Sequence, residues 1–299
     1  MDDNLIPSIP ESQEPAIDLK PSPADADPEE STVVVQPRKA SEYNELVDWE
    51  RRLAREEGFF RRLFQSVSAL RVADVGCGTG RHAVMFAKWG LDVVAIDPSA
   101  EMLDEAVAHA KDNADAIIGA GGRLEFVEAG FGDVAKVVAP DRVDAIICTG
   151  NTLPRVDGHD GLRTALRDFA EALRPGGALA LHFLNHTRLL QKRPAFLPPS
   201  VRETPEGRKL FIKLVDYPDS EEPITFDFLT VSEAPGDTWK TTVRSDPHTA
   251  LPVDFVTSAL VRAGFDVQET LGGHDGRRLE LLEDESALIA ARRRRHLRA

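Results

Sequence analysis

Short hydrophobic runs alternate with amphipathic segments along the chain from residue 41 onward. Runs rich in aliphatic and β-branched residues predict buried strands at 72–75, 91–97, 124–128, 143–148 and 178–184. Segments with apolar residues at helical spacing lie between these runs, at 81–89, 100–110 and 161–173. Because strand and helix alternate, we predict a doubly wound, mostly parallel α/β sheet with a ligand site at the carboxyl ends of its strands.

The two ends of this region carry further periodic segments. After Ser41, apolar residues at helical spacing predict two amphipathic helices separated at Gly58. Near the C-terminus, a helix over 252–263 is followed by a predicted pair of strands at 265–270 and 286–291.

Residues 209–244 differ from their surroundings because their apolar residues alternate with a period of two. Phe226 and Phe228 alternate with Thr225 and Asp227, and turn signals at 218–223 and 235–237 separate the runs. We predict a three-stranded antiparallel meander inserted between two core strands. It would serve as a lid over the site or as a surface for homo-oligomer association.

Composition divides the chain further. Residues 1–40 combine seven prolines with nine carboxylates, which predicts an acidic disordered tail. We assign the remainder to a core with an N-terminal helical cap, an inserted β lid, a C-terminal helix with its strand pair, and a basic tail, at 41–184, 185–250, 251–292 and 293–299.

The cysteine count and the N-terminus favour a cytoplasmic protein. Cys77 and Cys148 are the two cysteines, and each ends a predicted core strand, so we expect no disulfide framework. No apolar run approaches the roughly 20 residues that span a bilayer, and residues 1–3 are acidic where a signal peptide would be basic. We therefore expect no membrane partner.

Net charge argues against nucleic acid as a partner. The chain carries −14 at pH 7 with an isoelectric point near 5.1, which repels phosphates. The run of four arginines at 292–295 is the one basic feature that opposes this conclusion. It leaves RNA as an alternative partner, although such a run is also typical of a solvated terminus.

A glycine-rich turn follows the first predicted core strand. Asp74 precedes Gly76, Gly78 and Gly80, which alternate with Cys77 and Thr79 before the helix that begins at Arg81. Glycines at these positions permit a sharp turn and the close approach of a ligand to the first helical N–H groups. The third glycine comes one residue earlier than in the dinucleotide fingerprint, which speaks against a nicotinamide oxidoreductase. A tight turn that binds nothing is the alternative.

This turn resembles the Asp-x-Gly-x-Gly-x-Gly segment of class I S-adenosylmethionine (SAM)-dependent methyltransferases. The resemblance implies a Rossmann-like sheet of seven strands with the last antiparallel, and SAM as cofactor with S-adenosylhomocysteine as product. Asp97 ends the next strand and is expected to accept the ribose hydroxyls. The alternative for Asp97 is a helix cap, but Ser99 already stands where a cap is needed.

A second resemblance concerns the segment after the strand at 143–148. Gly150-Asn151-Thr152 looks like the Gly-Asn-Ser/Thr segment of glycine and sarcosine N-methyltransferases and their small-molecule relatives. Leu-Arg-Pro-Gly-Gly at 173–177 and Asn185 in its later motif also match that subgroup, whereas His186 and Thr187 replace its Tyr and Asp. That departure weakens the expectation of a glycine acceptor.

The resemblance implies a set of site residues. The expected cofactor contacts are Tyr43 and Trp49 over the methionine end, Met102 with Phe131, Gly132 and Asp133 around adenine, and Asp74, Gly76, Cys77, Gly78, Gly80, Arg81, Asp97, Pro98, Gly150 and Asn151 elsewhere. The candidates for positioning a methyl acceptor are Asn151, Asn185, Arg188, His182 and His248. The histidines and cysteines lack metal-ligand spacing, so we expect no metal.

These expectations combine into a predicted function. The chain would be an enzyme that moves a methyl group from SAM to a small-molecule acceptor, at an amine nitrogen or an oxygen, by in-line displacement. Two alternatives stay open: a SAM-binding interaction protein without catalysis, and an RNA methyltransferase that uses the arginine run.

Overall fold

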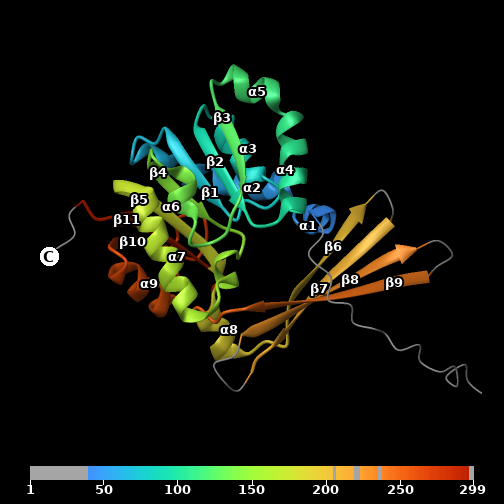
Figure 1. Ribbon diagram of the computed structural model, residues 1–299. Coiled ribbons are helices and arrows are strands. Elements are labelled where there is room, and N and C mark those ends of the chain that lie inside the picture. The colour runs from blue at the N-terminus through green and yellow to red at the C-terminus, as the bar shows by residue number, and fades with distance from the viewer. Residues whose placement is uncertain (1–39, 205–206, 219–222, 235–237, 296–299) are drawn as a thin grey trace, which may run out of the picture. The chain divides into compact units, whose positions relative to one another are not determined.

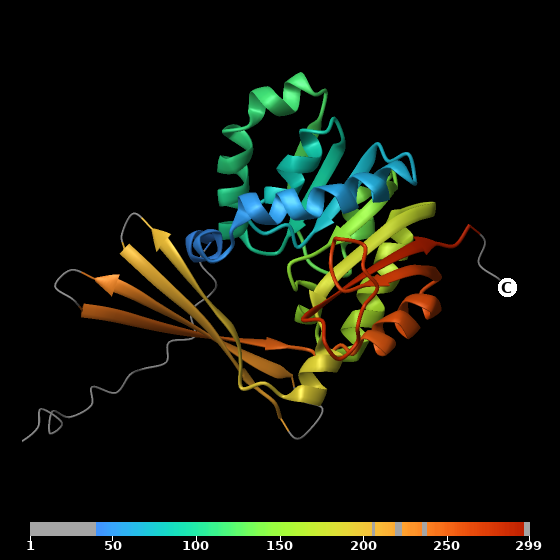
Figure 2. The same ribbon diagram turned by 180° about the vertical axis from the view of Figure 1, so that it is seen from behind.

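A computed structural model describes residues 40–204, 207–218, 223–234 and 238–295, which form two β-sheets (Figures 1 and 2). The larger sheet has seven strands in the order β10-β11-β5-β4-β1-β2-β3. These strands are β1 (Arg71–Val75), β2 (Asp92–Asp97), β3 (Arg123–Glu128), β4 (Val143–Cys148), β5 (Leu173–Leu184), β10 (Phe265–Leu271) and β11 (Ser286–Arg293). Strand β11 runs antiparallel to both of its neighbours, and the other pairs are parallel. The predicted seven-stranded sheet with an antiparallel last strand is confirmed.

Helices cover both faces of this sheet (Figures 1 and 2). Helices α2 (Trp49–Gln65), α3 (Arg81–Ala87) and α4 (Ala100–Lys111) pack on one face, and α6 (Val134–Val138), α7 (Gly158–Ala172) and α9 (Val253–Arg262) pack on the other. Ala178 and Ala180 of β5 are small, and this leaves room for the aromatic rings of α2 and α3 in the same core cluster.

The N-terminal helices differ from the prediction. Helix α1 (Ala40–Leu46) is short, and α2 runs without interruption through Gly58. The break between them comes earlier, where the carboxylate of Asp48 accepts the backbone N–H of Arg51 at 3.1 Å and caps α2. A glycine costs a helix only about 1 kcal/mol. Burial of Phe59 and Phe60, which directly follow the predicted break, therefore outweighs that cost.

The smaller sheet is antiparallel and has four strands, one more than predicted. Its order is β6 (Phe196–Thr204), β7 (Gly207–Asp216), β8 (Ile224–Ala234) and β9 (Thr238–His248). The strand that the pattern missed is β6, which contains Pro198 and Pro199. Prolines lack a backbone N–H and are tolerated on an edge strand, where β6 lies, with a register shift between Leu197 and Ser200.

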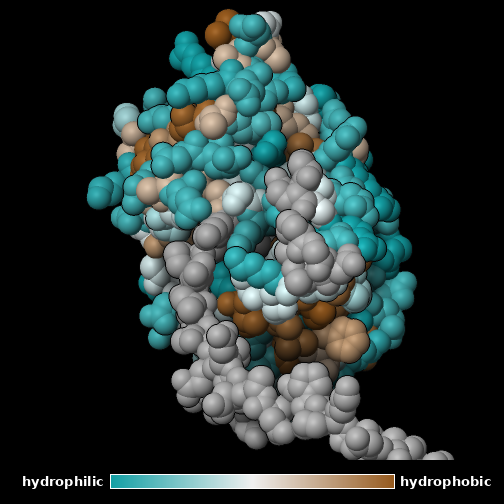
Figure 3. Space-filling view, turned by 90° about the vertical axis from the view of Figure 1, so that its right-hand side faces the viewer, coloured by the Kyte–Doolittle hydropathy of each residue, from teal (hydrophilic) through white to brown (hydrophobic). Residues whose placement is uncertain are grey.

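One face of the smaller sheet is apolar and exposed. Paired residues of an antiparallel sheet share a face. The pairs Phe196–Leu214, Val201–Leu210 and Glu233–Trp239 therefore define one face, which we call the outer face. Phe196, Val201, Leu214 and Trp239 are between 40% and 57% exposed there. Hydrophobic surface gathers in the lower part of Figure 3, which views the molecule from the side where this sheet lies in Figure 1.

Three further elements lie in segments for which the pattern predicts no helix or strand. They are α5 (Ala114–Gly119), the 3₁₀ turn η2 (Leu153–Arg155) and α8 (His186–Lys192). The predicted acidic tail falls outside the described residues except for Ala40, and so do residues 296–299 of the predicted basic tail. Among the helices described, none is long and apolar enough to cross a membrane.

The aromatic packing under α2 generates a prediction about stability. Phe60 is fully buried and contacts the rings of Phe64 and Phe86, with centroids at 6.2 and 5.1 Å. We expect Phe60→Ala to lower the free energy of unfolding by about 3–5 kcal/mol, through lost burial and the cavity left behind. Urea unfolding measures this change. Ile118→Ala on α5, where the side chain is 73% exposed, is the control and should stay within about 0.5 kcal/mol of wild type.

Candidate functional site

The glycine-rich turn between β1 and α3 has the backbone that its sequence predicts. Gly76, Gly78 and Gly80 have φ angles of +72°, +54° and +70°, in the left-handed region. A β-carbon on Gly76 would lie 2.1 Å from Cγ2 of Thr152, and one on Gly80 would lie 2.8 Å from Cβ of Ala106. Both positions therefore require glycine, for backbone conformation and for space.

Asp97 joins this turn to the next one. Its carboxylate accepts the backbone N–H of Gly78 at 2.8 Å and that of Ser99 at 3.0 Å. Ser99 caps α4 by accepting the N–H of Met102 at 3.3 Å, as the sequence predicts. Asp97 is thus free of the helix-capping role and stands, 8% exposed, in the wall of a cavity.

The cavity has a volume of about 340 Å³, within the range of small-molecule sites. Eight of the predicted cofactor residues line it: Tyr43, Gly76, Gly78, Asp97, Pro98, Met102, Phe131 and Gly150. Sequence reasoning missed six others: Val75, Ser99, Ala129, Gly130, Thr152 and Arg155. Most of these are next in sequence to a predicted residue, so their place in the cavity wall could have been predicted from that neighbour. Arg155 is not next to a predicted residue, and it reaches the cavity because of the turn at η2.

Helix α1 lies beside the glycine turn. The hydroxyl of Thr79 donates to Oδ1 of Asn44 at 2.8 Å, and Nδ2 of Asn44 donates to Glu105 of α4 at 2.9 Å. Tyr43 lines the cavity, whereas Trp49 does not: its ring meets Tyr43 and His82 edge-on, at centroid distances of 5.5 and 5.9 Å. Tyr43 therefore forms part of the cavity wall, and Trp49 packs against it.

Several predicted cofactor residues lie behind the cavity wall. Among the residues described, Asp74, Cys77, Gly80, Arg81 and Gly132 do not line it. Burial, reinforced by the nearby charge of Asp97, raises the pKa of Asp74 to about 6. The Oδ2 atom of Asp74 has no hydrogen-bond partner among the residues that the structure describes. Asp74 is therefore a buried carboxylate beneath the turn and not part of the cavity wall.

Asp133, predicted to contact adenine, is exposed and does not line the cavity. The polar contacts of this loop instead involve Asp168 of α7, which accepts the N–H groups of Gly132, Val134 and Ala135 at 3.1, 2.8 and 2.9 Å. Asp168 thereby satisfies the N-terminus of α6 and holds the loop against α7. Its neighbour Phe131 remains in the cavity wall.

Asn151 links the end of β4 to the smaller sheet. Its Oδ1 accepts the backbone N–H of Leu184 at 2.9 Å, which orients the amide so that Nδ2 donates to Nδ1 of His248 at 3.2 Å. That orientation leaves the proton of His248 on Nε2, 3.4 Å from Asp246. Asp246 also pairs with Arg155 and Arg244. Burial alone would raise the pKa of Asp246, but His248 and these two cations hold it well below its usual range. We call Asn151, His248, Asp246 and Arg155 the junction network.

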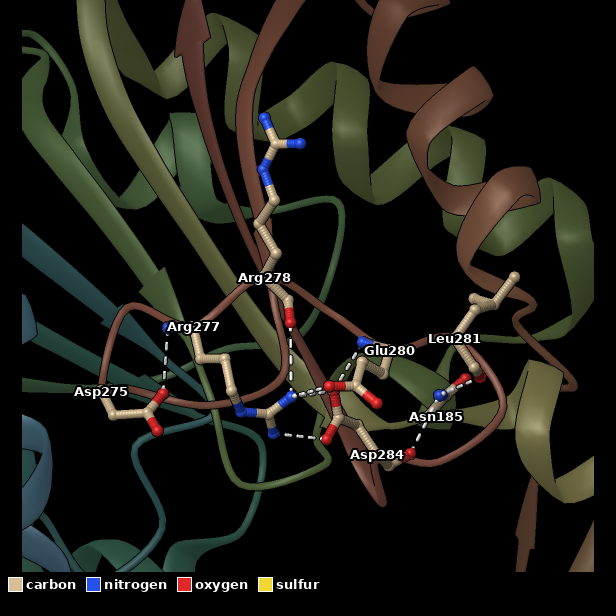
Figure 4. Close-up of polar contacts among 7 residues, drawn as sticks. All are labelled: Asn185, Asp275, Arg277, Arg278, Glu280, Leu281 and Asp284. Carbon is tan, nitrogen blue, oxygen red and sulfur yellow. Dashed lines mark hydrogen bonds and ion pairs between the residues drawn. The ribbon is translucent and has the colours of Figure 1, made fainter.

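Asn185, a predicted acceptor contact, is fully buried and its hydrogen bonds go to the chain itself (Figure 4). Its Nδ2 donates to the carbonyls of Leu281 and Asp284 at 2.7 and 2.9 Å, and its Oδ1 caps α8 through the N–H of Arg188. The same loop is closed by an ion pair between Arg277 and Asp284. Neither Asn185 nor Arg188 lines the cavity, and Asn185 anchors the 272–285 loop to α8.

That loop carries His274 into a buried polar cluster under α2. Glu56 is fully buried and contacts Nε2 of His82 at 2.6 Å, Nε of Arg52 at 3.0 Å and Nδ1 of His274 at 3.8 Å. His182, another acceptor candidate, packs against His274 at a centroid distance of 4.9 Å, and burial lowers the pKa of His182 to about 3. Arg52 reaches toward the cavity: a β-carbon on Gly150 would lie 3.6 Å from its Nη2.

This cluster makes stability depend on pH. Burial lowers the pKa of His274 from 6.5 to about 4, although the charge of Glu56 opposes the shift. Between these values the unfolded chain binds more protons than the folded chain, so stability falls as the pH decreases from 7 to 5. We expect His274 to account for about 2 kcal/mol of that loss.

Urea unfolding of wild type and His274→Gln at pH 7 and pH 5 measures this contribution. The variant should lose about 2 kcal/mol less than wild type over the same interval. His159→Gln, at an exposed histidine, controls for the substitution itself. Equal losses in wild type and His274→Gln would contradict the assignment.

Known N-methyltransferases resemble this chain over half or more of its length. The chain is 32% identical over 148 residues to a glycine/sarcosine N-methyltransferase of Halorhodospira halochloris, covering 50% of this chain and 52% of that protein. It is 29% identical over 190 residues to the glycine N-methyltransferase of Rattus norvegicus, covering 62% and 60%. The chain thus spans about half to three fifths of the length of these relatives.

Solved structures share the fold. The CcbJ methyltransferase of Streptomyces caelestis aligns with a TM-score of 0.67 at 20% identity, over 85% of this chain and 96% of that one. A SAM-dependent methyltransferase from Clostridium acetobutylicum aligns with a TM-score of 0.65 at 16% identity, over 85% and 97%. Residues 72–177 match the family described as "Methyltransferase domain". Residues 72–177 therefore resemble a methyltransferase domain, and the chain shares the fold of these solved methyltransferases.

Proposed function

We propose that this protein transfers a methyl group from SAM to a small-molecule acceptor, at an amine nitrogen. The observation that carries the proposal is the cavity in which Asp97, the glycine turn and the end of β4 meet. When bound, SAM supplies an electrophilic methyl group on a sulfonium, which a nucleophile displaces in line. The residues of this chain hold, orient and enclose the two reactants.

The residues present fit the cofactor. Asp97 offers carboxylate oxygens to a pair of ribose hydroxyls at the end of β2. Pro98, Met102 and Phe131 provide an apolar slot of the kind that an adenine ring occupies. Tyr43 lines the same cavity, and Arg52, which pairs with Glu56, lies close to Gly150 and is our candidate cation for the carboxylate of the methionine end. Asp133 is exposed and lies outside the cavity wall, so the structure favours it less than the sequence does as the acceptor for the adenine amine.

The junction network is proposed to position the acceptor. Asn151 follows Gly150, which lines the cavity, and the amide of Asn151 is held by Leu184 and His248. Arg155 lines the same cavity and is paired with Asp246. Both ring nitrogens of His248 are engaged, so its role is to orient Asn151. A neutral amine already carries the lone pair that attacks the methyl group. Methyl transfer to such an amine therefore needs no dedicated base.

The names of related proteins support nitrogen as the acceptor atom. The relatives above include a glycine/sarcosine N-methyltransferase, and the structural neighbours include the sugar N-methyltransferase KedS8, with a TM-score of 0.58 at 17% identity. No metal is part of the proposal. Among the described residues, no group of three or more His, Cys, Asp or Glu side chains has an arrangement that would hold a metal ion. We also propose a reducing, cytoplasmic location, with which the free, buried state of Cys77 and Cys148 agrees.

Cofactor binding is tested by calorimetric titration of the protein with SAM, S-adenosylhomocysteine and NAD. We expect the two adenosyl sulfur ligands to bind and NAD not to bind. Turnover of small amines then separates an enzyme from a SAM-binding protein without catalysis. Binding of NAD alone would contradict the proposal.

Substitution of Asp97 tests the ribose contact. We expect Asp97→Ala to weaken binding of SAM by roughly 2–3 kcal/mol, about 30- to 150-fold, because charged hydrogen bonds are lost. Asp97→Asn keeps an acceptor oxygen for the turn and should lose less. Asp92→Ala, at the other end of β2 and outside the cavity, is the matched control. Unchanged affinity in folded Asp97→Ala would remove Asp97 from the site.

We also propose that the outer face of the smaller sheet binds a second copy of the chain. Its centre is apolar, with Leu210, Ile212, Leu229 and Val231 in register between the exposed residues. Polar pairs flank it, Arg208–Glu233 at one end and Asp227–Ser245 at the other. An apolar centre with a polar rim is typical of an interface, and a face present on every copy suits a two-fold dimer.

Sedimentation of wild type and Leu214→Glu tests this association. We expect wild type to be a dimer and the variant a monomer, because the new carboxylate would be buried without a partner. Ile118→Glu adds the same charge at an exposed apolar position on α5 and should leave the dimer intact. A wild-type protein that is monomeric at all concentrations would contradict the proposal.

A further inference from the structure

A second cavity lies far along the sheet from the site described above. Its volume is about 1080 Å³, and its lining residues come from the loop after α2, the starts of β5 and β10, and the end of β11. Register places it at the opposite edge of the sheet: Arg292 of β11 pairs with Ala178 near the start of β5, whereas Asp97 ends β2 and Gly150 follows the carboxyl end of β4. The proposed methyl transfer makes no use of this cavity.

Five arginines converge on this cavity, and we call them the arginine cluster: Arg174, Arg292, Arg293, Arg294 and Arg295. The chain as a whole carries a net charge of −14, so this concentration of positive charge runs against its composition. Two carboxylates compensate part of it. Asp144 pairs with Arg174, and Asp266 pairs with Arg294 at 2.8 Å. Among the described residues, Arg292, Arg293 and Arg295 have no carboxylate within ion-pair distance, which leaves the cluster about three positive charges in excess.

Neutral oxygens hold the guanidinium groups in place. Arg292 donates to the hydroxyl of Ser66 at 2.6 Å, and Arg293 donates to the carbonyl of Leu173. Arg174 donates to the carbonyl of Val67 in addition to its carboxylate partner. Because hydroxyl and carbonyl oxygens orient a guanidinium without neutralising it, the cluster is pre-organised and still cationic. The pKa of Arg292 is lowered by partial burial and by the charge of Arg174, as expected where like charges are crowded.

From these observations we infer that the arginine cluster binds a compact anion that carries several phosphate groups, such as a triphosphate chain. Guanidinium groups bind phosphate oxygens through paired N–H donors, and several of them around one cavity match the charge of a triphosphate. Ser68 and Gln268 add polar groups to the same wall.

The observations favour a compact anion over RNA. Single-stranded nucleic acid is bound by stacking its bases on aromatic side chains, and none of the described residues that line this cavity is aromatic. A long polyanion would also extend beyond the cavity over a surface that belongs to an acidic chain. A triphosphate confined to the cavity meets neither obstacle.

The test is calorimetric titration of the full chain with inorganic triphosphate, with ATP, with sulfate at matched ionic strength and with a single-stranded RNA 20-mer. Saturating S-adenosylhomocysteine is present throughout, so that ATP does not enter the adenosine cavity. We expect inorganic triphosphate and ATP to bind, with affinity that falls as salt rises. Sulfate binding as tightly as triphosphate, RNA binding without triphosphate, or no binding of triphosphate would each overturn the inference.

Two variants locate the binding. Arg292→Gln with Arg293→Gln should weaken triphosphate binding at least tenfold, whereas Arg123→Gln with Arg262→Gln, two exposed arginines outside the cavity, should not change it. Gln268→Glu adds a carboxylate to the cavity wall while leaving every arginine in place, and should also weaken binding. If both cavity variants fold and bind triphosphate like wild type, the site is elsewhere and the inference fails.

Discussion

The carboxylate of Asp97 is the interaction on which the cavity depends. By accepting N–H groups from Gly78 and Ser99, it ties together the turns that follow β1 and β2. Both turns expose backbone N–H groups, and a buried carboxylate satisfies them while remaining at the surface of the cavity. The left-handed glycines are the complement of this interaction, since a β-carbon at Gly76 would collide with Thr152 and push the turn away from Asp97.

The smaller sheet is joined to this site by charge. Asp246 of β9 pairs with Arg155 of η2, and His248 of the same strand holds the amide of Asn151. On the other side, Lys209 of β7 pairs with Glu45 of α1 at 2.8 Å. The inserted sheet therefore contacts both the segment after β4 and the helix that carries Tyr43. A displacement of this sheet would disturb both sides of the cavity together.

Most of the larger sheet could be predicted because its determinants are local. A buried parallel strand shows as a short aliphatic run, and Ser99 caps α4 through Met102, three positions away. Predictions failed where packing outweighed local preference. Gly58 does not break α2, because Phe59 and Phe60 are held in the core, and β6 forms despite its prolines because it occupies an edge.

The sequence by itself determined the glycine turn, Asp97 and the position of Asn151 after β4, since each follows from residues adjacent to a predicted strand end. Only the tertiary structure decided how the other polar groups are used. Asp168 binds the N-terminus of α6, Asn185 anchors a loop, and Arg155 enters the cavity wall. These outcomes join residues about 30 to 100 positions apart, and no short-range pattern records which distant backbone group a side chain will meet.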